Sequence, residues 1–130
     1  GSAQPAFGFV SSIMATQTLG QLYEAAVSQG RQDMAALCHS FPVLRNKPGT
    51  RPWDQHAFAR WASGPAPSHA SRQAAAFVLS VWNGGTPEGG GWWNEGEYSV
   101  GVFDVVDAFG RWDHGQQAAF LAWCANPFWP

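Results

Sequence analysis

Charged residues are scarce in this chain of 130 residues, and they form no run of one sign. Lys plus Arg number 7 and Asp plus Glu number 9, so 12% of the residues are charged and the net charge is −2. An average soluble domain carries about 25%. The nearest approach to a basic cluster is Arg31, Arg45, Lys47 and Arg51, spread over one region. We therefore expect no nucleic-acid partner, since gripping phosphates requires a concentrated basic patch.

Long apolar runs and paired cysteines are also missing. No stretch of 18 apolar residues occurs, and a membrane-spanning helix requires about that length. The two cysteines, Cys38 and Cys124, stand apart from any CxxC or Cys/His spacing. We interpret both as small buried hydrophobes of a cytoplasmic protein with no membrane association. The alternative is a disulfide between them in an exported protein.

Signatures of common enzymes are absent as well. The chain holds no GxSxG, HExxH or phosphate-binding loop, and its Gly-rich segment does not follow a strand. We therefore expect no cofactor and no metal. A catalytic site assembled from residues distant in sequence remains compatible with this pattern.

What the chain has in abundance is aromatic side chains, with 8 Trp and 9 Phe among 45% apolar residues. A chain of this length folds around one core, and each large ring buries on the order of 150 to 250 Å². Because this core is too small to hide every ring, we expect some at the surface. The candidates are Trp92, Trp93, Phe128 and Trp129.

The spacing of apolar residues is typical of helices throughout. Capping residues and Pro or Gly breakers set the expected ends. We expect helices from Thr18 to Gly30, from there to Pro42 as the second arm of a hairpin, after Pro52 to Ser63, from Ser68 to Trp82, from Phe103 to Trp112, and from Asp113 to Pro127. The predicted fold is all-α, a compact bundle of five or six helices with a long Gly/Trp-rich loop between the fourth and fifth.

The chain is expected to form one domain over residues 14–130. Gly1-Ser2 is typical of a cleaved purification tag, and residues 3–13 show no period. Met14 is the expected native start; the alternative is that residues 3–13 begin a mature exported chain or are the remnant of a longer protein. One Lys against six Arg, with abundant Ala and Gly, fits a bacterial gene of high GC content.

Candidate binding residues gather in the segment from Glu88 to Tyr98. Large rings alternate there with acidic residues, in the set Trp92, Trp93, Glu95, Glu97 and Tyr98, and the aromatic C-terminus adds Phe128 and Trp129. Trp and Tyr dominate protein interfaces, and the acids would repel phosphates but suit a basic protein or a cationic ligand. We predict a non-catalytic protein-interaction domain, binding a protein partner or a second copy. The alternative is that the loop rings fold back over the core.

Two alternative functions are open. A small hydrolase or metal-dependent enzyme would use Asp104 with Asp107, or Cys38 with His39 and His56. These residues also have structural explanations: Asp107 lies four residues before Arg111, and His39 suits the C-terminus of a helix. The other alternative is a small-ligand pocket lined by tryptophans between helices.

Overall fold

The computed structural model describes residues 18–83 and 91–130, and in these residues it contains helices and no strand. The elements are α2 (Leu19–Ser40), η1 (Pro42–Leu44), α3 (Gln55–Ser63), α4 (His69–Trp82), η2 (Trp92–Asn94), α5 (Val105–Arg111) and α6 (His114–Ala125). The prediction of an all-α fold is confirmed. None of these helices is long and apolar enough to cross a membrane.

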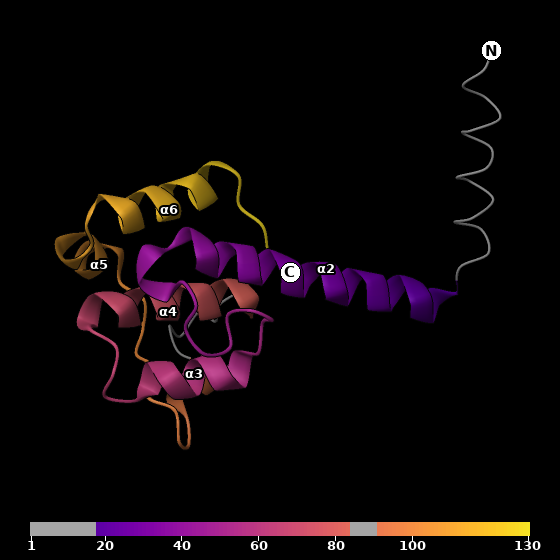
Figure 1. The fold of residues 1–130 in the computed structure, drawn as a ribbon, viewed down its shortest axis with the longest axis horizontal. Coiled ribbons are helices and arrows are strands. Elements are labelled where there is room, and N and C mark those ends of the chain that lie inside the picture. The colour runs from indigo at the N-terminus through magenta and orange to yellow at the C-terminus, as the bar shows by residue number, and fades with distance from the viewer. Residues whose placement is uncertain (1–17, 84–90) are drawn as a thin grey trace, which may run out of the picture.

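Helix α4 occupies the centre of the bundle (Figure 1) and contacts α2, α3 and α5. Ser68 caps its N-terminus by accepting the backbone N–H of Ser71, and Asn83 follows its last turn, as predicted. Nine of its 14 residues are buried, including Phe77, Val78 and Leu79. Because it is apolar almost all round, α4 can only be a core helix.

Helix α2 is one continuous helix of 22 residues, so the predicted hairpin at Gly30 is wrong. Thr18 and Gln21 form a capping box at its start. Glycine in a helix interior costs roughly 1 kcal/mol relative to alanine but does not stop the helix. The tertiary structure explains this glycine, since a Cβ at residue 30 would lie 3.1 Å from the Cβ of Pro130. The C-terminal tail crosses α2 there.

The first half of α2 projects away from the rest of the molecule (Figure 1). Every residue from Thr18 to Gln29 is exposed, whereas Gly30, Met34, Leu37 and Cys38 are buried. We call Leu19–Gln29 the arm, and residues 30–83 with 91–130 the body. The body is complete without the arm, because its core begins only at the first buried residue of α2.

The fifth and last helices differ in part from the expected ones. Asp104 is the N-cap of α5 and accepts the N–H groups of Val106 and Asp107, so α5 starts later than predicted. The apolar spacing predicts that Val102, Val105 and Val106 share the inward face of this helix, but all three are exposed, Val106 by 80%. A helix of seven residues buries only Ala108, and the buried Trp112 follows its end.

The cap of α6 is predicted correctly, but part of its inward face is not. Asp113 accepts N–H groups of the first turn. Phe120 packs against Phe77 with 5.0 Å between ring centroids. The apolar spacing also predicts that Leu121 and Cys124 face inward, but both are exposed.

The loop before α3 contains the tightest backbone approach. Gly49 has a φ of +77°, and its carbonyl accepts the backbone N–H of Asp54, the N-cap of α3, at 2.8 Å. Helix α3 therefore begins after Trp53, and that ring is buried beneath the loop. A Cβ at residue 49 would lie 2.5 Å from both the Asp54 carbonyl oxygen and the Phe58 nitrogen.

We expect Gly49→Ala to lower the free energy of unfolding by about 3 kcal/mol, because it combines left-handed backbone strain with a backbone clash. Urea denaturation followed by tryptophan fluorescence measures the change. Gly110→Ala is the matched control, since nothing lies within 4 Å of a Cβ there; it should be neutral or stabilising by up to about 1 kcal/mol. Equal denaturation midpoints for Gly49→Ala and the wild type would contradict the expectation.

Candidate functional site

The loop tryptophans do not form the exposed pair expected from the sequence. Trp93 is only 3% exposed, belongs to the core, and donates its indole N–H to the Gly101 carbonyl at 3.2 Å. Trp92 is half-buried and packs edge-on against Trp93 and Tyr98, at centroid distances of 6.1 and 5.1 Å. Trp93 therefore follows the alternative prediction, in which the rings of this loop fold back over the core.

The acidic residues of this loop are exposed, and one has a basic neighbour. Glu97 lies 3.6 Å from Arg60 of α3, and Glu95 is also exposed. The Tyr98 hydroxyl lies 3.2 Å from His56 Nδ1. These contacts link the loop to α3, and Arg60 partly neutralises the charge of Glu97. Glu88 lies outside the described residues.

The C-terminal tail lies on the opposite side of the body from this loop (Figure 1). Trp123 of α6 donates its indole N–H to the Phe128 carbonyl at 3.3 Å, and Trp129 packs edge-on against Trp123 at 5.3 Å. Phe128 is half-buried, whereas Trp129 is 60% exposed. The two halves of the predicted binding surface are therefore not brought together.

An apolar stripe on the arm is the largest exposed feature that the sequence reasoning did not assign to binding. Leu19, Leu22, Tyr23 and Val27 are all exposed, Leu19 by 86% and Tyr23 by 71%. With Ala26 they occupy one helix face, and the same face continues into the buried residues Gly30, Met34, Leu37 and Phe41. Their spacing correctly predicted a helix, but the expected hairpin at Gly30 placed this helix beside the next segment of the chain.

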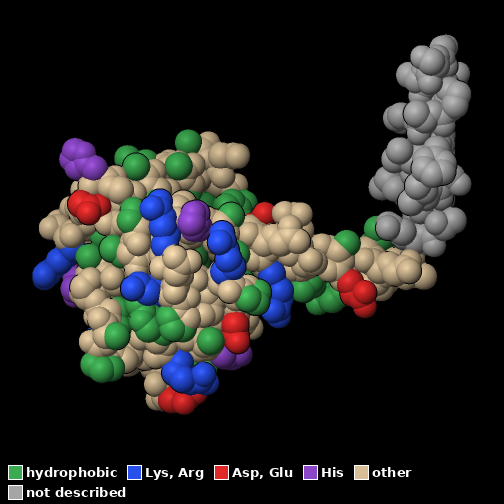
Figure 2. Space-filling model, viewed as in Figure 1, with side chains coloured by type: hydrophobic (Ala, Val, Ile, Leu, Met, Phe, Trp, Pro, Cys, Tyr) green, Lys and Arg blue, Asp and Glu red, His purple; other side chains and the backbone are tan. Residues whose placement is uncertain are grey.

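The arm carries almost no charge. Glu24 is the only Asp, Glu, Lys or Arg among residues 19–29, and it lies about 140° around the helix from Leu19. Figure 2 shows the arm extending from the body, whereas most charged side chains in that view lie on the body. An apolar face flanked by polar residues is typical of an interaction surface.

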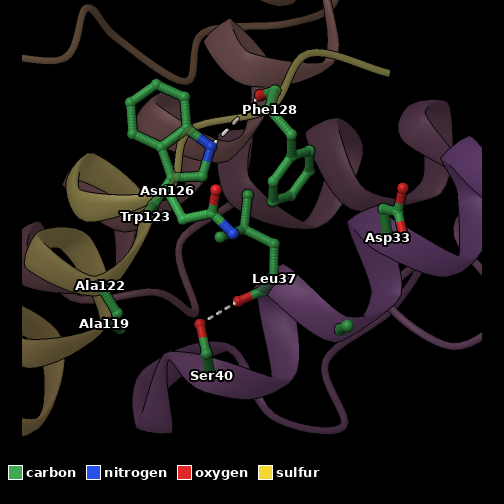
Figure 3. A pocket seen from close by; sticks show the side chains of 9 residues that line it. Asp33, Leu37, Ser40, Ala119, Ala122, Trp123, Asn126 and Phe128 are labelled. Atoms are coloured by element: carbon green, nitrogen blue, oxygen red, sulfur yellow. Dashed lines mark hydrogen bonds between the residues drawn. The ribbon is translucent and has the colours of Figure 1, made fainter.

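Two hollows of about 400 Å³ each adjoin the body half of α2. The first, at the base of the arm, is lined by Tyr23, Ala26, Val27, Gly30, Arg31, Trp82 and Pro130. The second lies between α2 and α6 (Figure 3) and has small residues such as Ala36, Ala119 and Ala122, with the rings of Trp123 and Phe128. Each has only one tryptophan in its lining, so the arrangement differs from a pocket lined by several.

The residues of the catalytic alternatives have other roles. Cys38 is buried, and burial raises the pKa of its thiol to about 12, whereas a nucleophilic cysteine needs a lowered pKa. His39 is exposed on the last turn of α2. His56, on α3, forms a hydrogen bond with the Tyr98 hydroxyl. Within the described part of the chain, no group of three or more His, Cys, Asp or Glu is placed to hold a metal ion.

The two aspartates at the start of α5 each have other partners. Asp104 uses its carboxylate to cap the helix. Asp107 contacts His69 of α4 and Arg111, four residues on, at 3.7 Å. The predicted pair with Arg111 is confirmed, and His69 is an additional partner.

Comparison of the chain with protein-family models, curated proteins and solved structures gave no match.

We expect a thiol reagent to modify one cysteine of the native protein at neutral pH, because Cys124 is exposed and Cys38 is buried with a raised pKa. Mass spectrometry locates the adduct. The Cys124→Ser variant should stay unmodified until denaturant is added. Rapid modification of native Cys38 would contradict the described burial.

We expect the Asp107 carboxyl to titrate below its ordinary pKa of 3.8, chiefly because His69 hydrogen-bonds to the carboxylate and the charges on His69 and Arg111 add to this. A lowered pKa in the folded state stabilises the fold above the ordinary pKa, and this contribution is lost as the pH falls through the lowered one. Carboxyl NMR titration measures it. His69→Gln should raise the pKa, and an unchanged value would show that His69 is not the cause.

Proposed function

We propose that this chain is a protein-interaction domain without catalytic activity, and that it binds through the apolar stripe of the arm. The observation that carries the proposal is the continuity of this stripe. One helix face is buried from Gly30 to Phe41 and exposed from Leu19 to Val27, although its composition is apolar in both halves. A binding partner would cover the exposed half as the body covers the other.

The free energy available from such binding is substantial. Burying a large apolar side chain contributes roughly 1.5 to 3 kcal/mol, and the stripe offers Leu19, Leu22, Tyr23 and Val27. Ordering the arm offsets part of this, because short helices without tertiary contacts are marginally stable in water. The capping box at Thr18 reduces the ordering cost by holding the first turn in helical geometry.

The aromatic C-terminus remains part of the proposed surface, and the loop around Trp92 does not. Pro130 contacts Gly30 at the base of the arm, and exposed Trp129 precedes it. Trp93 is a core residue, and Trp92 covers it. Two free thiols, Cys38 and Cys124, suit a reducing compartment such as the cytoplasm. Within residues 18–83 and 91–130, no contact favours the hydrolase or metal-dependent alternative.

A photo-crosslinking amino acid placed on the arm tests this proposal in cells of the source organism. Substituting p-benzoylphenylalanine for Tyr23 should give covalent protein adducts on irradiation. The control is the same substitution at Ser28, which lies on the polar side of the same exposed segment. Adducts at position 28 equal to those at position 23, or none at either, would overturn the proposal.

A further inference from the structure

We infer that the protein bound by the arm is a second copy of this chain, and that the two arms pair antiparallel. This inference rests on the proposed function and names the partner of the same surface. The position of the body, the length of the arm, the sizes of the side chains on the stripe and the lack of charge all favour this pairing.

The body excludes parallel pairing of two arms. Helix α2 presents one face to the body from Gly30 onward, and the stripe on the arm is the same face. A second helix on this stripe lies 8–10 Å away, the usual spacing of packed helices. A parallel copy would place its own body in the space that the first body occupies. An antiparallel copy places the two bodies at opposite ends.

The length of the arm matches this geometry. From Leu19 to Gly30 the helix rises about 1.5 Å per residue, or roughly 16 Å, before the stripe passes under the body. A second copy supplies a helix of the same length that ends in the same way. Full antiparallel overlap sets Leu19 opposite Gly30 of the partner subunit, and Tyr23 opposite Ala26 of the partner subunit.

The side chains in this register are complementary in size. Positions 19, 23, 26 and 30 follow the spacing of four, three and four residues that is typical of paired helices. The central layer combines the large Tyr23 with the small Ala26, and the outer layer places Leu19 at the hollow beside Gly30, which Pro130 contacts. Alternation of large and small residues across facing positions allows close packing. The pairing is isologous, because both copies use the same surface.

Charge and area also favour a second copy. The stripe has no charged residue, and Glu24 points away from it, so antiparallel arms meet without like-charge repulsion. A stable interface buries about 800 Å² per partner, and two helices in contact over roughly 16 Å fall short of that. The hollow at the base of each arm, beside Trp82 and Pro130, adds buried area to the interface, because it receives the partner's Leu19.

Sedimentation equilibrium of the full chain under reducing conditions tests the inference. We expect a concentration-dependent species of twice the 14.1 kDa chain mass. Tyr23→Glu should weaken dimerisation at least about tenfold, whereas Ser28→Glu, with the same charge change on the opposite face, should alter it by less than about twofold. Circular dichroism confirms that both variants keep their helix content.

Cysteine crosslinking tests the orientation, in a Cys124→Ser background. The double variant Tyr23→Cys with Ala26→Cys should form disulfide-linked dimers under mild oxidation, because these positions face one another. Leu19→Cys alone should not, since antiparallel arms keep the two copies of residue 19 far apart. Efficient crosslinking through residue 19 would overturn the antiparallel arrangement.

The outcomes separate this inference from the proposed function. A chain that stays monomeric at every concentration, while position 23 crosslinks to a different protein in cells, overturns the second copy as the partner but retains the binding surface. A monomer without any adduct at position 23 overturns both. A dimer that Tyr23→Glu and Ser28→Glu weaken equally places the interface elsewhere.

Discussion

The packing of aromatic rings around Phe77 is the contact on which the body depends. Phe77 lies in the middle of α4, and the ring centroids of four other aromatic residues lie within 5.8 Å of its own centroid. They belong to Phe41, Phe103, Phe120 and Trp123. These rings come from the end of α2, the segment before α5, and α6. Because each ring removes a large apolar area from water, one side chain holds three distant segments against the central helix.

This centre also explains why α2 is buried over only half its length. The aromatic cluster needs the last turns of α2, where Phe41 is fully buried, and Trp82 and Pro130 mark the edge of the body beside Gly30. Beyond that edge every described residue of the helix is exposed, although its apolar stripe continues. The arm is therefore an apolar surface produced by the fold, and self-pairing is one geometry that covers it.

Three aspartates and one buried glutamine hold backbone groups in place. Asp54, Asp104 and Asp113 cap three helices. The buried Gln73 accepts the Asp104 N–H and donates to the Val102 carbonyl. Buried polar groups need such partners, since an unpaired one costs roughly 1 to 3 kcal/mol. The scarce polar residues of this chain thus maintain the fold, which is consistent with a surface that binds through shape and apolar area.

The sequence by itself determined the helical class, the caps at Ser68 and Asp113 and the start of α2 at Thr18, because capping hydrogen bonds reach only two or three residues along the chain. The spacing of Leu19, Leu22, Tyr23, Ala26 and Val27 in the sequence also indicates a single apolar helix face. Only the tertiary structure decided that α2 continues through Gly30, that Trp93 turns inward and that Cys124 turns outward. Those outcomes depend on contacts between residues far apart in sequence, such as Pro130 on Gly30, and local pattern carries no information about which segment will cover an apolar face.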